Sequence, residues 1–150
     1  MANPKGAPME RSADIVQLVH DWFAAASRGD TSLVDKHVSG AEGARLIGSD
    51  PDEWLRGGDA IARFLRDEVT GAAGDVTFTP SDTEAFRQGS VGWAATRLTI
   101  ALPDGKRVTP RWTAVFVHDN GVWRFVQTHA SIGVANEGVG WTYDETLTTT

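Results

Sequence analysis

RWTAVFVHDNGVWRFVQTHAS, residues 111–131, is the stretch that decides the fold. Two runs rich in Val, Thr, Phe and Trp flank Asn120-Gly121, and both turn residues accept the positive φ that a type I′ turn requires. The stretch therefore predicts a β-hairpin in which Asp119 pairs with Val122. Counting outward from this turn places four pairs on one face: His118/Trp123, Phe116/Phe125, Ala114/Gln127 and Trp112/His129.

Two further runs of strand-forming residues precede this hairpin. The four predicted strands are 76–87, 91–102, 107–118 and 122–132, and Gly89-Ser90, Asp104-Gly105 and Asn120-Gly121 are the predicted two-residue loops between them. This order predicts an antiparallel meander. Because pairing preserves the face, the predicted registers put three rows on one face: Phe86, Trp93, Phe116 and Phe125; Glu84, Ala95, Ala114 and Gln127; Asp82, Arg97, Trp112 and His129.

The N-terminal half has the periodicity of helices. Ser12 is a predicted N-cap for a helix that ends near Ser27, and shorter helices are predicted over 32–38 and 60–69, with a short strand at 45–48. The fold class is therefore α+β, with three N-terminal helices packed on a four-strand antiparallel meander plus a short strand. We predict an N-terminal tail over 1–11, one domain over 12–132 and a C-terminal extension over 133–150.

Composition narrows the classes of function. The chain has 150 residues, 41% of them hydrophobic and 23% charged, as in ordinary globular proteins. Its net charge of −6 disfavours nucleic acid and anionic membranes as partners, and no apolar run is long enough for a membrane span. The absence of cysteine excludes thiolate chemistry, and His20, His37 and His118 show no metal-ligand spacing with one another. We expect a cytoplasmic protein without a metal or cofactor.

The predicted inner face suggests a small-molecule site, because aromatic walls surround a few polar groups. We expect Asp82, Arg97 and His129 to form its polar, catalytic end, with Arg97 stabilising negative charge and Asp82 or His129 moving a proton. The alternatives are an ordinary Asp82–Arg97 salt bridge and a His129 packed on Trp112. The expected cavity residues are Trp22, Trp54, Phe64, Trp93, Trp112, Phe116, Phe125 and Gln127.

The chain resembles SnoaL-like domains of the nuclear transport factor 2-like (ketosteroid isomerase-like, cystatin-like) superfamily. The resemblance covers roughly 12–132 and depends on Trp22 followed by Gly29-Asp30, on Gly57 to Ala60 with Ile61 and Phe64, and on Gly121-Val-Trp-Arg-Phe125 running to His129 and Ser131. It implies a cone-shaped fold whose ligands lie between the concave sheet face and the helices. It also implies that the Asp50–Glu53 loop lies near the pocket mouth, where Trp54 would act as a lid.

The same resemblance implies two classes of function. The superfamily includes ketosteroid isomerase, polyketide cyclases, an epoxide hydrolase and dehydratases, and it also includes binding modules without chemistry. We therefore expect a small apolar or polycyclic ligand, with acid–base chemistry of the isomerase, cyclase or hydrolase type. The alternative is a non-catalytic ligand-binding or dimerisation module. A Thr- and Val-rich outer sheet face predicts a homodimer.

Overall fold

The computed structural model describes residues 6–141. Three helices are present in this range: α1 (Ala13–Ser27), α2 (Ser32–His37) and α3 (Gly58–Gly71). The strands are β1 (Met9–Arg11), β2 (Arg45–Ile47), β3 (Trp54–Arg56), β4 (Thr77–Gln88), β5 (Val91–Ala101), β6 (Arg107–Val108), β7 (Arg111–Asp119) and β8 (Val122–Ser131). A 3₁₀ turn, η1, spans Asn136–Val139. The fold is α+β, as the sequence predicts.

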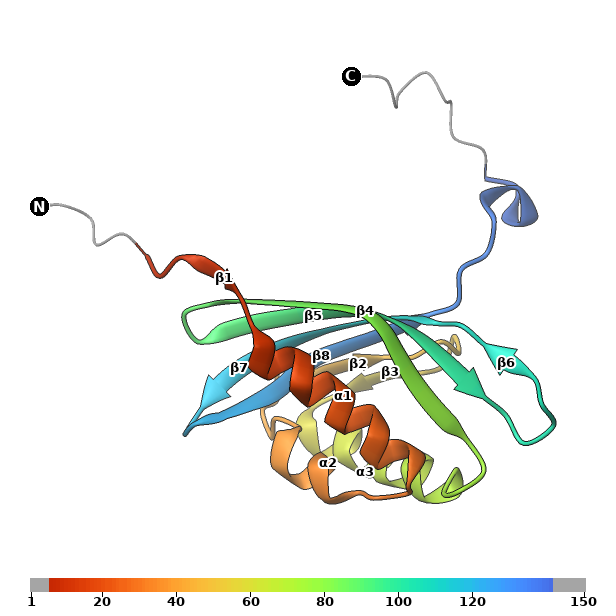
Figure 1. Ribbon diagram of the computed structural model, residues 1–150, viewed down its shortest axis with the longest axis horizontal. Helices are drawn as coiled ribbons and strands as arrows, with labels where there is room; N and C mark the ends of the chain where they lie inside the picture. Colours follow the sequence, from red (N-terminus) through yellow and green to blue (C-terminus); the bar gives the residue numbers. More distant parts are fainter. Residues whose placement is uncertain (1–5, 142–150) are drawn as a thin grey trace, which may run out of the picture.

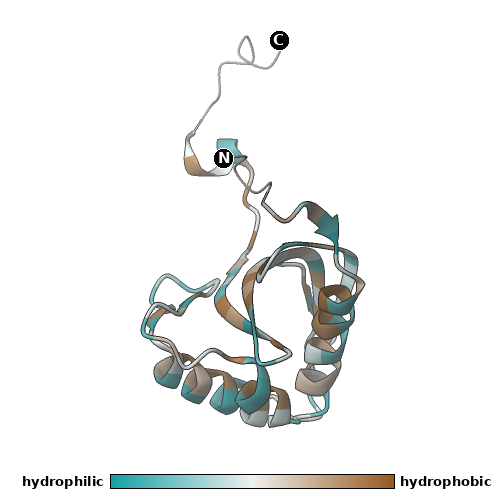
Figure 2. Ribbon diagram, turned by 90° about the vertical axis from the view of Figure 1, so that its left-hand side faces the viewer, coloured by the Kyte–Doolittle hydropathy of each residue, from teal (hydrophilic) through white to brown (hydrophobic). Residues whose placement is uncertain are grey.

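One curved sheet holds all of the strands. Its order is β1-β4-β5-β7-β8-β2-β3, and β6 pairs with β5. The three helices lie on one side of this sheet, with α1 crossing under its long strands, and the segment after β8 runs away from the domain (Figure 1). Viewed from the end, the sheet curls around one side of the interior and the helices close the other (Figure 2). We call the face toward the helices the inner face and the opposite one the outer face.

The core lies between α1 and the inner face. Ser12 begins α1 by accepting a hydrogen bond from the Ile15 amide at 3.2 Å, and Ile15 and Val19 are fully buried. Trp22 lies 4.5 Å from Phe125, measured between ring centroids, and Phe23 meets Trp112 edge-on at 5.2 Å. These aromatic contacts hold α1 against β7 and β8.

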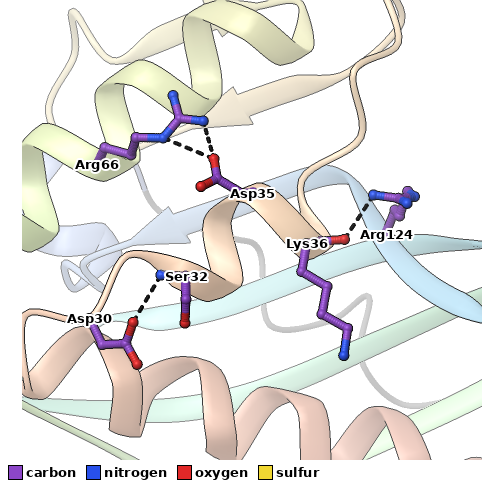
Figure 3. Close-up of polar contacts among 6 residues, drawn as sticks. All are labelled: Asp30, Ser32, Asp35, Lys36, Arg66 and Arg124. Carbon is purple, nitrogen blue, oxygen red and sulfur yellow. Dashed lines mark hydrogen bonds and ion pairs between the residues drawn. The ribbon is translucent and has the colours of Figure 1, made fainter.

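Polar contacts connect the short helix α2 to α3 on one side and to β8 on the other (Figure 3). Arg66 of α3 forms an ion pair with Asp35, and Arg124 of β8 donates to the Lys36 carbonyl oxygen at 2.8 Å. At its start the Asp30 carboxylate accepts from the Ser32 amide at 2.9 Å. This hydrogen bond lowers the pKa of Asp30, because it stabilises the charged carboxylate.

Two of the three predicted hairpin loops are correct. Asp119 pairs with Val122 around Asn120-Gly121, whose φ values of 48° and 76° are those of a type I′ turn. Gln88 pairs with Val91 around Gly89-Ser90. The loop predicted at Asp104-Gly105 is wrong. Ala101 pairs with Arg107 and the Leu102 amide donates to the Lys106 carbonyl oxygen, so the loop has three residues, 103–105.

The third residue in that loop shifts the β5–β7 register by one. Trp93 pairs with Val115, and Gly92 pairs with Phe116. Since alternate residues of a strand point to opposite faces, Trp93 and Phe116 lie on opposite faces and not in one row. The inner side is identified at Gly92, where an added Cβ would overlap Ile15 of α1. Phe86, which pairs with Trp93, therefore lies on the outer face with it.

Two bulges change the predicted rows further. In β8 the pairing passes from Phe116/Phe125 to Val115/Gln127, so Val126 is the extra residue. Beyond it, Thr128 and Ala130 pair with the inner-face residues Ala114 and Trp112. Gln127 and His129 therefore lie on the outer face, which corrects the prediction that they belong to the inner one. In β4 the extra residue lies between Ser81 and Glu84, where Asp82 has φ 51°.

Three elements differ from the sequence expectations. Met9–Arg11, assigned by sequence to the tail, forms the edge strand β1 on β4. Trp54–Arg56 forms the opposite edge strand β3 on β2. The run predicted over 107–118 is divided by Thr109-Pro110, because proline has no N–H for the ladder, and the Pro110 carbonyl oxygen still accepts from Leu98 at 3.0 Å. Residues 142–150 of the predicted C-terminal extension lie outside the described residues.

Candidate functional site

A cavity of about 230 Å³ lies between the inner sheet face and helices α1 and α3. Its walls are mostly hydrophobic. The lining residues are Trp22, Phe23, Ala26, Leu46, Ile47, Gly48, Ser49, Glu53, Phe64, Leu65, Glu68, Val69, Phe78, Leu98, Ile100, Pro110, Trp112, Thr128 and Ala130. We refer to this space as the inner cavity.

The inner cavity exists because large residues at one end of the inner face give way to smaller ones at the other. Phe116, Phe125 and Trp123 fill the space under α1 and are buried. Beyond the Val126 bulge the inner positions of β8 are Thr128 and Ala130, both half-buried. Small side chains there leave unfilled space next to Trp112, and α3 contributes Phe64 and Leu65 across it.

The polar groups of the inner cavity lie mainly in the turn between β2 and β3. The Gly48 amide donates to the Glu53 carbonyl oxygen at 2.8 Å, which closes this turn. The Glu53 side chain folds back over Gly48, where an added Cβ would overlap its carboxylate. Glu53 is half-buried, whereas Glu68 of α3 is exposed. Among the described residues, no Lys, Arg or His lines the inner cavity.

Three of the predicted cavity residues line the inner cavity: Trp22, Phe64 and Trp112. Phe116 and Phe125 face the same side but are packed in the adjoining core, where their ring centroids are 4.6 Å apart. They pack behind the residues that line the cavity and do not line it themselves.

The other predicted cavity residues lie elsewhere. Trp93 stacks on Phe86 on the outer face, with centroids 6.3 Å apart. Gln127 is exposed on the same face. Trp54 is 56% exposed on edge strand β3, outside the lining of the inner cavity. The expectation that these three line the cavity is therefore wrong, because register and strand position turn them away from it.

The predicted catalytic residues are not brought together in the inner cavity. Asp82 and Arg97 form an ion pair, with Oδ2 and Nε 3.5 Å apart, but their side chains are 80% and 77% exposed. They line a second hollow together with Glu84, Arg111 and five neighbours on β4, β5 and β7. His129 is exposed on the outer face and lines neither space. A catalytic role for the three stays a prediction.

The sequence pointed to only part of this lining. Phe23 and Phe78 have the spacing of ordinary core residues, and nothing in it separates a cavity wall from a packed interior. The predicted register places Leu98 and Ile100 on the outer face, and this is wrong, because the shifted β5–β7 register puts them on the inner face. Glu53 lies in the loop that the family resemblance places near the pocket mouth, and this was the one available signal. Glu68 was recognisable only as a periodic position of the third helix.

Residues 6–141 contain neither a cluster of metal-binding side chains nor a membrane-spanning helix. No group of three or more His, Cys, Asp or Glu side chains in this range is arranged to hold a metal ion. None of the helices in the range has the length and apolarity that a membrane span needs.

Comparison with known proteins identifies the family. The profile of the SnoaL-like domain matches residues 15–135. No curated protein sequence matches the chain. Among solved structures, an NTF2-like protein of unknown function from Pseudomonas putida has a TM-score of 0.71 at 16% identity, over 88% of this chain and 93% of that one.

Two further solved structures are similar. A protein with a cystatin-like fold from Caulobacter vibrioides has a TM-score of 0.68 at 20% identity, covering 90% of this chain and 96% of its own. A nuclear transport factor 2-like superfamily protein from Salmonella enterica has a TM-score of 0.66 at 20% identity, covering 87% and 95%. These likenesses show the fold. With the profile match over most of the chain, they establish that the protein belongs to the SnoaL-like domain family and has the nuclear transport factor 2-like fold.

Proposed function

We propose that the protein binds a small molecule with an apolar ring in the inner cavity. The observation that carries this proposal is a space of about 230 Å³ with a mainly hydrophobic lining next to the buried aromatic core. Apolar spaces of ~150 Å³ hold benzene. A space of this size therefore suits one ring with a short substituent better than the polycyclic ligand that the sequence also allowed.

Binding does not require turnover. Isomerase, cyclase or hydrolase chemistry stays a prediction, because Asp82, Arg97 and His129 lie outside the inner cavity lining. The groups of the cavity that can move a proton are the carboxylates of Glu53 and Glu68. A binding protein without a reaction is the second candidate, and the exposed positions of the predicted catalytic residues favour it.

Benzyl alcohol is a suitable neutral probe, followed by changes in backbone amide NMR shifts on titration. Shifts should concentrate on residues around the inner cavity. Ala130→Phe places a ring in that space and should abolish them, whereas Ala95→Phe adds the same ring on the exposed outer face and should leave binding intact. Shifts that survive Ala130→Phe, or no shifts at all, would contradict the proposal.

We also propose that a second copy of the chain covers the outer face. Phe86, Trp93, Val115 and Val117 are half-buried there, and Val91 is 42% exposed. Contiguous apolar surface of this kind is typical of association sites. Light scattering on a size-exclusion column should give the mass of a dimer for the native chain and that of a monomer for Trp93→Arg. A native monomer across the accessible concentrations would overturn this proposal.

A further inference from the structure

The charges around the inner cavity have one sign. Glu53 and Glu68 are the charged residues in its lining, and the other lining residues are neutral. A carboxylate ligand would be repelled by both, whereas a ligand with a positive charge would be attracted. The absence of any basic lining residue among those described leaves nothing to pair with an anion.

The neutral residues of the cavity lining also favour a positively charged ligand. Five of the lining residues are aromatic: Trp22, Phe23, Phe64, Phe78 and Trp112. Phe23 sits between two of the others, with its ring centroid 5.2 Å from that of Trp112 and 6.2 Å from that of Phe78. Aromatic faces attract ammonium groups through their quadrupole, most strongly where water is excluded. This attraction does not depend on the carboxylates.

The Glu53 carboxylate is the better placed of the two. Its Oε2 accepts from the Asp50 amide at 3.4 Å, and its side chain lies over Gly48 in a turn closed by backbone hydrogen bonds. Glu53 is half-buried and Glu68 is exposed, so solvent screens Glu68 more strongly. Glu53 should therefore contribute more to ligand selection.

From these features we infer that the inner cavity is selective for an organic cation, namely a single-ring amine or ammonium compound. The ring occupies the apolar space and the ammonium group lies toward Glu53. This inference rests on the proposed function, since it names the class of ligand that the same cavity takes. It predicts discrimination between molecules of nearly equal shape and different charge.

Benzylamine, benzyl alcohol and benzoate provide such a series, because they share one ring and are positive, neutral and negative at neutral pH. Dissociation constants for all three should be measured by amide-shift titration at low and high NaCl. Benzylamine should bind most tightly and benzoate most weakly. Added salt should weaken the binding of benzylamine and leave that of benzyl alcohol almost unchanged.

Isosteric variants test whether the carboxylates of the cavity cause the preference for benzylamine. Glu53→Gln should weaken benzylamine binding about 2- to 5-fold, the range of a partly exposed ion pair, and Glu68→Gln should weaken it less. Asp52→Asn and Asp67→Asn remove the same charge from neighbouring residues outside the lining and should have no effect. Asp52→Asn and Asp67→Asn should also bind benzyl alcohol as the native chain does. For Glu53→Gln and Glu68→Gln the readout is the ratio of the benzylamine to the benzyl alcohol dissociation constant, which a general disturbance of the cavity would leave unchanged.

The outcomes separate the two proposals. If benzyl alcohol binds, and benzylamine binds no better or benzoate binds as well, the charge selection is wrong while the ligand-binding function stands. If Glu53→Gln and Asp52→Asn weaken benzylamine equally, overall charge and not the cavity is responsible, and the inference is also overturned. If none of the three probes binds, the proposed function itself fails.

Discussion

His37 Nδ1 of α2 lies 2.8 Å from the carbonyl oxygen of Trp123 on β8. This contact joins a short helix to the end of the central hairpin. Burial lowers the pKa of His37 below its ordinary value of 6.5, and the hydrogen bond to Trp123 opposes this shift only in part. The folded protein therefore favours the neutral imidazole.

The His37 contact predicts a pH-dependent stability. The unfolded chain takes up the proton first, so the stabilisation is fully present above pH 6.5 and is lost as the pH falls toward the lowered pKa of the folded state. Urea unfolding of the native chain and His37→Gln at about pH 7.5 and about pH 5.5 checks this. The native chain should lose more stability than the variant on acidification. Equal losses would show that other groups control the acid response.

The cap of α1 offers a matched pair of substitutions. Ser12 is buried and its hydroxyl accepts from the Ile15 amide, whereas Thr31, the cap of α2, makes no side-chain cap bond. Ser12→Ala should lower the free energy of unfolding by about 1 kcal/mol, because an amide at the helix start loses its acceptor. Thr31→Ala should change it little, and a similar cost at both sites would contradict this account.

Gly92 is required by the close approach of α1 to β5. A Cβ at this position would overlap Ile15 Cδ1 and lie 3.3 Å from the Trp123 ring. Gly92→Ala should destabilise the fold by about 1–3 kcal/mol through overpacking. Gly71→Ala, at the end of α3 where an added Cβ meets nothing within 4 Å, is the control and should be neutral or slightly stabilising. Chemical denaturation of the two variants and the native chain measures these changes in the free energy of unfolding, and an equal change in both variants would contradict this account.

The exposed positions of Arg97 and His129 predict that neither takes part in binding within the inner cavity. Arg97→Ala should cost about 0–1 kcal/mol of stability, as surface ion pairs do. Arg97→Ala and His129→Ala should both bind benzyl alcohol as the native chain does. If either variant lost benzyl alcohol binding as completely as Ala130→Phe is expected to, the substituted residue would belong to the binding site, as the sequence predicted.

Much of the fold is encoded locally. Asn120-Gly121 adopts a type I′ turn because both residues accept positive φ, and the Asp119/Val122 register follows from it without other information. Ser12 and the apolar spacing after it likewise place α1. These features depend on neighbours in the chain, so the sequence alone was enough for them.

The faces of the sheet are different. The extra loop residue at 103–105 and the bulge at Val126 each shift the register by one residue, so the side chains beyond them lie on the opposite face from the one predicted. Neither feature has a clear local signal in the sequence. They moved Trp93 and His129 to the outer face and put Thr128 and Ala130 on the inner one.

The sequence by itself determined the family, the helices and two of the three tight turns, because short-range chemistry specifies each of them. Only the tertiary structure decided which residues line the inner cavity. Each loop and each bulge along the meander changes the register of the strand that follows. The small cavity forms where the side chains that face one another are too short to meet, and the register decides which side chains these are.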